Sequence, residues 1–119
     1  MNVDTMAYDE LSLVQNALTR VISDGRIGRP CYMQCLLQED DAHAQLDRLV
    51  HLSEAVFGNC GDRLHEESSR PGHLTAVMRW PAGESALLTV FVPAVKQRVK
   101  LDLVLLGSRG AVYYSSPGA

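Results

Sequence analysis

The stretch from Leu74 to Tyr114 constrains the fold most, because apolar segments and turn residues alternate along it. Three long apolar-rich segments are followed by a short one: Leu74–Trp80, Ser85–Val92, Arg98–Leu106 and Ala111–Tyr114. Turns that contain glycine, which readily adopts positive φ, separate the first segment from the second and the third from the fourth. This pattern predicts a β-meander, in which consecutive strands pair.

The predicted strands differ in whether one or both of their faces are apolar. In the third segment, Val99, Leu101, Leu103 and Leu105 point one way, while Arg98, Lys100 and Asp102 point the other. The second segment is apolar on both faces, since Leu87 and Phe91 lie opposite Ala86, Leu88, Val90 and Val92. A strand that is apolar on both faces is covered on both faces. Two helices can cover only one, so we expect an oligomer interface on the other, at Leu87, Thr89, Phe91 and Val104.

The rest of the chain supplies two helices and one more strand. Apolar residues recur at helical spacing from Tyr8 to Ile22 and again from Leu46 to Phe57, and Gly25 and Gly58 end the two helices. The alternating segment Cys31–Gln38 predicts a strand in the same sheet. Asn59–His73 is polar and is predicted to be a long surface loop, although it could include a short strand. Residues 1–6 and 115–119 are expected to be flexible.

These elements predict one α+β domain over residues 1–119, with a mainly antiparallel open sheet and two helices packed on one face. The formal net charge is −3 with no basic run, which argues against nucleic acid or an anionic membrane as a partner. No secretory signal or apolar run long enough to span a bilayer is present, so a cytoplasmic location is expected. Cys31, Cys35 and Cys60 are expected to be free, mostly buried thiols.

The order of these elements resembles the C-terminal domain of the Gfo/Idh/MocA oxidoreductases, the glucose-fructose oxidoreductase and inositol dehydrogenase family. Ser23–Pro30 resembles the family's helix-to-strand turn, and Leu46–Gly58 resembles its central helix. Leu74–Val112 resembles its three strands and Gly-x-x-Gly turn. The resemblance implies an α+β domain that assembles through its sheet.

The departures from the family pattern concern catalysis. The chain has neither the glycine-rich turn of a Rossmann domain nor the family's Glu-Lys-Pro segment, so NAD or NADP is expected only if a Rossmann-domain partner exists. Where the family's central helix carries histidine and, three residues later, aspartate, this chain has Arg48 and His51. An arginine stays protonated and makes a poor acid-base group.

Other candidate residues have ordinary structural interpretations beside functional ones. His43, Asp47 and His51 form one helix stripe that could hold zinc, but a solvated face is the more common meaning of such a stripe. Cys31 and Cys35 lie too far apart along a strand for one tetrahedral metal. His65 and His73 flank the polar segment, where a ligand could bind. Trp80 beside Arg79 indicates packing, an interface or the wall of a pocket.

Three roles fit these observations. The first is a stand-alone, non-catalytic, oxidoreductase-derived domain that forms a homodimer or higher oligomer through its sheet and acts as a binding or scaffolding module. The second is the substrate-side domain or subunit of an NAD(P)-dependent oxidoreductase whose nucleotide-binding domain lies elsewhere. The third is a small-ligand sensor that uses the sheet face and the Asn59–His73 segment.

Overall fold

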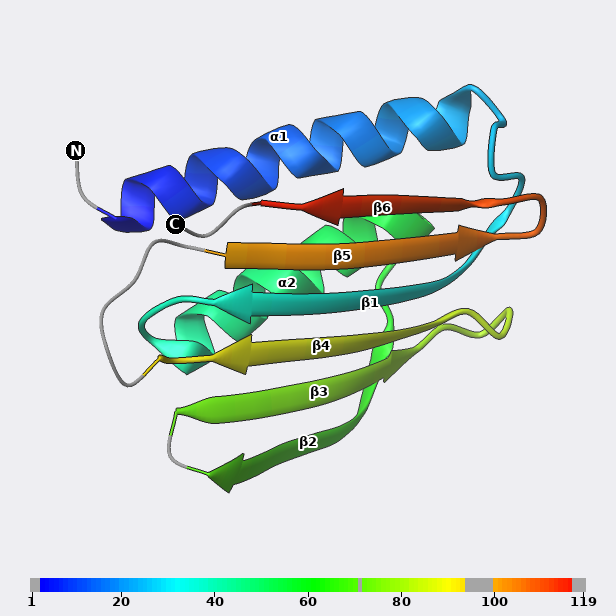
Figure 1. Cartoon of the computed structure of the whole chain (residues 1–119). Coiled ribbons are helices and arrows are strands. Elements are labelled where there is room, and N and C mark those ends of the chain that lie inside the picture. The colour runs from blue at the N-terminus through cyan, green and yellow to red at the C-terminus, as the bar shows by residue number, and fades with distance from the viewer. Residues whose placement is uncertain (1–2, 71, 94–99, 117–119) are drawn as a thin grey trace.

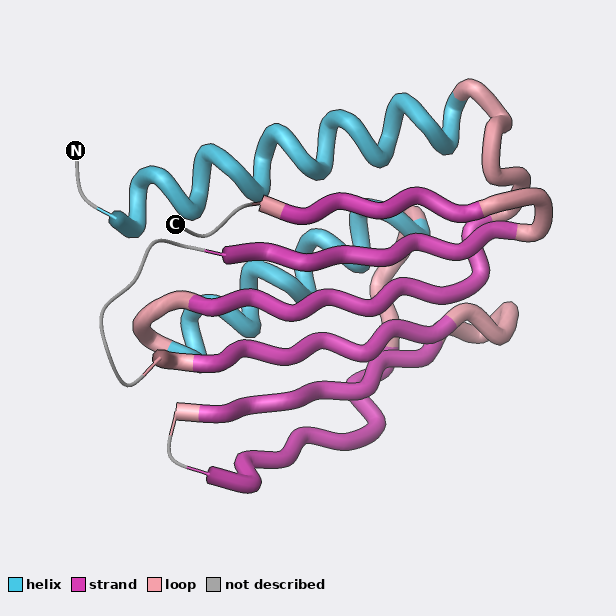
Figure 2. The backbone as a smooth tube through the Cα atoms, viewed as in Figure 1, coloured by secondary structure: helices cyan, strands magenta, loops and turns pink. Residues whose placement is uncertain are grey.

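The structure, a computed structural model, describes residues 3–70, 72–93 and 100–116. This part of the chain forms two helices and one six-stranded sheet (Figures 1 and 2). The helices are α1 (Val3–Ser23) and α2 (Ala42–Phe57). The strands are β1 (Pro30–Gln38), β2 (Asp62–Arg70), β3 (His73–Arg79), β4 (Ser85–Phe91), β5 (Lys100–Gly107) and β6 (Ala111–Ser115). The predicted α+β class is confirmed.

The sheet has the strand order β2-β3-β4-β1-β5-β6, so the predicted meander is wrong at one point. β1 lies between β4 and β5, parallel to β4 and antiparallel to β5. All other neighbouring pairs are antiparallel. Cys35 therefore has Leu88 on one side and Leu103 on the other. Alternation along a segment indicates which residues share a face, but it does not indicate which strands are neighbours.

Both helices pack on one face of the sheet, as predicted. α2 lies against β1, β3 and β4, and α1 packs on α2 (Figure 1). One cluster of buried side chains fills the space between these layers, with Leu18, Leu49, Met33, Leu88 and Leu103 all at most 2% exposed. We call the sheet face under the helices the covered face and the opposite one the open face.

Glycines with positive φ and a capping aspartate determine where the helices end and begin. Gly25 (φ 74°) lies in the turn after α1, and Gly58 (φ 87°) forms the C-cap of α2. Asp41 is the N-cap of α2, and its carboxylate accepts a hydrogen bond from the N–H of Ala44. α1 begins at Val3, five residues before the predicted start at Tyr8. Residues 3–6, which we expected to be a loose arm, therefore belong to the helix.

Two further expectations are corrected. The segment predicted as a long loop contains the nine-residue edge strand β2, which pairs with β3. All its side chains described, from Asp62 to Ser68, are exposed, so it lacks the apolar alternation that indicates a strand. Ser115 ends β6, and Ser116 is buried with its hydroxyl accepting a hydrogen bond from the Leu101 N–H, so neither belongs to a flexible tail.

The third apolar segment begins, in the prediction, with Arg98 and Val99, which lie outside the described residues, as do residues 117–119. Neither described helix is long and apolar enough to cross a membrane.

Candidate functional site

The open face is built from side chains that the strand register aligns into rows across five strands. Because successive side chains alternate between faces, the residues paired in register on neighbouring strands stand side by side. The central row runs from β3 to β6 through Val77, Leu87, Gln34, Val104 and Tyr113. The next row contains Thr75, Thr89, Leu36, Asp102 and Ser115. The central row is thus mainly apolar and carries no charge.

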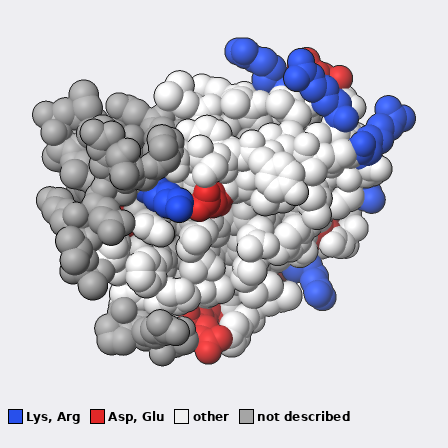
Figure 3. Space-filling model, viewed as in Figure 1, with Lys and Arg blue, Asp and Glu red and all other residues white. Residues whose placement is uncertain are grey.

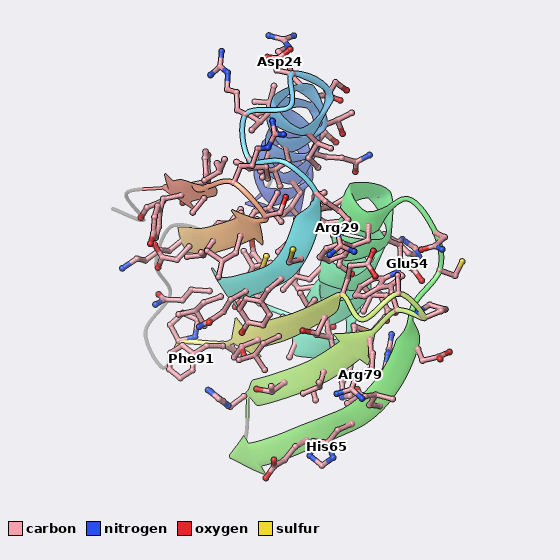
Figure 4. The ribbon with its side chains drawn as sticks, turned by 90° about the vertical axis from the view of Figure 1, so that its right-hand side faces the viewer. Asp24, Arg29, Glu54, His65, Arg79 and Phe91 are labelled. Atoms are coloured by element: carbon pink, nitrogen blue, oxygen red, sulfur yellow. The ribbon has the colours of Figure 1, made fainter. Side chains whose placement is uncertain are left out.

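All four residues predicted to form an interface lie on this face. Leu87, Thr89, Phe91 and Val104 are each partly exposed, whereas their covered-face neighbours in β4 and β5 are almost fully buried. Phe91 points to the side of the sheet opposite α2 (Figure 4). The structure therefore places these side chains at the surface, and their role in assembly stays a prediction.

Few charges interrupt the centre of the open face. Lys100 and Asp102 are neighbours on the same side of β5, with their charged atoms 3.9 Å apart. The hydroxyls of Thr75 and Thr89 lie 3.2 Å apart, which satisfies one polar pair within the sheet. Tyr113 is 76% exposed and Leu106 is 39% exposed, so this face presents large apolar side chains to solvent. Figure 3 shows that most of the atoms visible on this side belong to uncharged residues.

A second candidate site lies in the helix layer, between α1 and α2. A partly open hollow of about 240 Å³ is lined by Leu11, Ser12 and Gln15 of α1 and by Arg48, His51 and Leu52 of α2. Arg48 and His51 were singled out by the family resemblance, and the structure brings them together here. The α1 residues were not predicted as site residues, because Ser12 and Gln15 look like ordinary polar positions on an exposed helix face.

The metal site considered for α2 receives no support. His43, Asp47 and His51 are all exposed, as expected of a solvated helix face. Asp47 instead pairs with Arg63 of β2, at 3.5 Å. Within the described ranges, no three His, Cys, Asp or Glu side chains are placed so that they could hold a metal ion.

All three cysteines are free thiols, but they differ in exposure. Cys35 is buried beneath the helices, and burial raises the pKa of its thiol well above the usual range. Cys31 is partly exposed, and its thiol donates a hydrogen bond to the Arg29 carbonyl. Cys60 is exposed, which corrects the expectation that the thiols are mostly buried.

The remaining candidate residues lie either in the core or at the surface. Trp80 is 2% exposed, its indole N–H donates to the Asn59 carbonyl at 2.8 Å, and its ring packs on Phe57. It is therefore a packing residue. His65 is exposed on β2 beside Glu67, whereas His73 makes an edge contact with Phe91 on β4. The two histidines that flank the polar segment thus have different neighbours and do not form one site.

Neither a family model nor a curated protein sequence matches this chain. Several solved dehydrogenases do resemble its structure. One is the WlbA dehydrogenase from Bordetella pertussis, solved with NADH and UDP-GlcNAcA, at TM-score 0.67 and 15% identity over 87% of this chain. Another is a probable dehydrogenase from Thermotoga maritima, at TM-score 0.69 and 11% identity over 88% of this chain.

The scyllo-inositol dehydrogenase from Lactobacillus casei, solved with bound NAD(H) and scyllo-inositol, gives TM-score 0.65 and 12% identity over 84% of this chain. The match spans only 38–39% of the length of these three dehydrogenases. The resemblance to Gfo/Idh/MocA dehydrogenases is therefore confirmed at the level of the fold. The chain shares the architecture of about two fifths of such an enzyme.

Proposed function

We propose that this domain is a non-catalytic assembly module that binds a second copy of itself through the open face of its sheet. The observation that carries the proposal is the central row, an uncharged band across five strands that ends in the exposed Tyr113. Single exposed apolar residues are ordinary on a protein surface, but a row of neighbouring, mostly apolar side chains across a sheet is typical of an interaction surface.

The open face is large enough for such an interface. Strands lie about 4.8 Å apart and rise about 3.3 Å per residue, so five strands of about seven residues span roughly 24 by 23 Å. Two such faces in contact would cover about 1,100 Å² in projection, and accessible area exceeds projected area. Stable interfaces bury about 1,200–2,000 Å² in total, so we expect a dimer that forms at micromolar concentration.

The non-catalytic part of the proposal depends on the helix layer. Proton transfer needs a group that can lose and regain a proton near neutral pH, which a guanidinium does not do. Arg48 occupies the position at which the family resemblance leads us to expect a histidine. The sequence also has no glycine-rich strand-to-helix turn, so no residue here is assigned to a dinucleotide. The three cysteines of the chain are free thiols, which is consistent with a reducing compartment such as the cytoplasm.

Light scattering coupled to size-exclusion chromatography tests the proposal. We expect the wild-type chain at about 50 µM, well above a micromolar dissociation constant, to elute as a dimer or a larger oligomer. Val104→Lys places a charge in the central row and should give a folded monomer. Leu13→Lys places the same charge at a 69% exposed position on α1, away from the open face, and should leave the oligomer intact. A monomeric wild-type chain would refute the proposal.

A second role is favoured by one observation, the match to only two fifths of each dehydrogenase. On this alternative, the chain is the substrate-side half of an NAD(P)-dependent oxidoreductase, and a separate Rossmann-domain protein supplies the nucleotide site. Affinity purification of the tagged chain from its own cells should then recover such a protein, and the pair should bind NAD or NADP in calorimetry. Recovery of the chain with copies of itself only would contradict this alternative.

A further inference from the structure

Gln34 lies at the centre of the open face. It is the middle residue of β1, and β1 is the middle one of the five strands that form the central row. Its partners in register are Leu87 on β4 and Val104 on β5. Along β1, Tyr32 and Leu36 flank it on the same face. A primary amide is thus surrounded by mainly apolar side chains in the middle of the proposed interface.

The hydrogen bonds of this amide are only partly made within one molecule. The Tyr32 hydroxyl donates to Gln34 Oε1 at 3.2 Å, but none of the described residues accepts a hydrogen bond from the amide nitrogen. Gln34 is exposed, so water is available to its N–H groups. A second copy that covers the central row removes this water, and a buried amide costs free energy unless its polar atoms are paired. An interface on this face therefore needs an acceptor opposite Gln34.

Two-fold symmetry supplies that acceptor. Identical chains most commonly associate about a two-fold axis, so that the same patch of both molecules meets itself. Between two stacked sheets this axis lies in the plane of contact, and when the faces overlap fully it crosses their centre. Gln34 then lies opposite Gln34 of the second copy, whatever direction the axis takes in the plane. Stacked sheets are about 10 Å apart and a glutamine side chain spans about half of that distance, so the two amides meet. Each carries both donors and an acceptor, so each can donate to the oxygen of the other.

We propose that Gln34 aligns the two copies, because its amide pair at the two-fold axis fixes the orientation in which the open faces pack. This role rests on the proposed function, since it requires that the open face binds a second copy. Apolar contacts are non-directional and tolerate sliding. A displaced arrangement would place each amide against apolar neighbours such as Leu36 and leave its N–H groups unpaired. A single polar residue selects one alignment in the same way in coiled coils with apolar seams.

A charge-swap experiment tests whether Gln34 faces itself. Gln34→Glu and Gln34→Lys each place two like charges together at the axis, so each variant alone should weaken the dimer at least about tenfold in analytical ultracentrifugation. An equimolar mixture should form a heterodimer, with a dissociation constant within about threefold of the wild-type value, because opposite charges then meet. The same swaps at Leu36, next along β1, and at Val77, at the end of the central row, are the controls. Seen from Gln34 these two positions lie in roughly perpendicular directions, so one axis passes over at most one of them, and at least one control mixture should show no rescue.

A distance measurement tests whether Gln34 sets the alignment. Leu13→Cys, at a 69% exposed position on α1, carries a nitroxide spin label in a chain in which Cys31→Ser and Cys60→Ser remove the other accessible thiols. Pulsed electron paramagnetic resonance should give one narrow distance between the labels of a dimer. Gln34→Leu removes both amides together and leaves no polar group unpaired, so the dimer should persist, but its distance distribution should broaden or split.

The outcomes separate this role from the proposed function. A monomeric wild-type chain refutes the proposed function and the alignment with it. A wild-type dimer whose Gln34→Glu and Gln34→Lys variants do not rescue each other leaves the proposed function standing and overturns the alignment. An unchanged distance distribution in the Gln34→Leu dimer overturns it as well.

Discussion

The backbone N–H of Arg29 donates a hydrogen bond to the hydroxyl oxygen of Ser108, 2.9 Å away, and the N–H of Ser108 donates to the Arg29 carbonyl at the same distance. The N–H of Arg109 donates in turn to the Ile27 carbonyl at 2.7 Å. These bonds join the turn before β1 to the turn between β5 and β6. The two turns, which resemble family motifs at separate places in the sequence, thus form one structural unit.

Gly28 is a residue of this unit at which both the backbone conformation and the available space disfavour a side chain. Its φ is 73°, and a Cβ at this position would overlap the Ser108 hydroxyl and lie 2.9 Å from the Arg109 side chain. Gly25 has nearly the same φ, 74°, but a Cβ there would meet no atom within 4 Å. Left-handed backbone costs a residue other than glycine about 1–2 kcal/mol. We expect Gly25→Ala to cost about 1 kcal/mol and Gly28→Ala about 2–4 kcal/mol, because it adds the clash.

Urea denaturation followed by the fluorescence of Trp80, the single tryptophan, measures both free energies of unfolding. The comparison isolates the contact with Ser108, because the backbone penalty is common to the two variants. Equal losses of stability would show that the two turns do not pack against each other as the structure has them.

Trp80 should be the most sensitive single position in the core. It is 2% exposed, contacts Phe57 with ring centroids 4.5 Å apart, and lies against Gly61. We expect Trp80→Ala to lower the free energy of unfolding by about 3–5 kcal/mol, because it leaves a large cavity. Trp80→Phe should cost about 1–3 kcal/mol, since it loses volume and the hydrogen bond to Asn59. Circular dichroism gives the stability of both variants, and Leu13→Ala, at a 69% exposed site, should change it by less than about 0.5 kcal/mol.

The elements that face a core were predictable from the sequence, because burial of one face imposes a regular spacing of apolar residues. β5 is the clearest example, with Leu101, Leu103 and Leu105 buried and Asp102 and Val104 partly exposed. β2 was not predictable in this way, since its described side chains are exposed on both faces. The insertion of β1 between β4 and β5 was also missed, because strand order depends on contacts between residues far apart in sequence.

The candidate sites were predictable to different degrees for the same reason. Leu87 and Val104 could be placed on an open face, because a strand pattern fixes the direction of each side chain. The hollow between α1 and α2 could be identified only from the structure. Arg48 and His51 were notable through the family resemblance, but nothing in the sequence of α1 indicated that Ser12 and Gln15 would lie opposite them.

Cys35 should react only after unfolding, whereas Cys60 should react in the native protein. The thiolate is the nucleophile in alkylation, and the raised pKa of Cys35 keeps its thiol protonated in the folded state. Mass spectrometry after treatment with iodoacetamide at about pH 8, just below the ordinary thiol pKa, should find label on Cys60 and none on Cys35. Rapid labelling of native Cys35 would contradict its burial.

The same shift makes stability depend on pH. Above about pH 8.5 the unfolded chain releases the Cys35 proton while the folded chain keeps it, so the unfolded state binds fewer protons. The contribution of this group to stability is therefore complete below that pH and is lost as the pH rises. Cys35→Ala should show a smaller fall in the free energy of unfolding from about pH 8 to about pH 10 than the wild type does. Parallel curves for the two proteins would exclude this linkage.

Self-association through the open face should depend little on salt. The central row has no charged residue, and Lys100 and Asp102 are close enough to offset each other within one molecule. Between about 0.05 and 0.5 M NaCl the Debye length falls from about 14 Å to about 4 Å, so contacts between exposed charges weaken while apolar contacts do not. We expect the dimer dissociation constant, measured by analytical ultracentrifugation, to change by less than about threefold. A tenfold or greater weakening would instead indicate a contact between opposite charges, such as the exposed Arg26, Arg29 and Arg109 around the two joined turns against acidic side chains of a second copy.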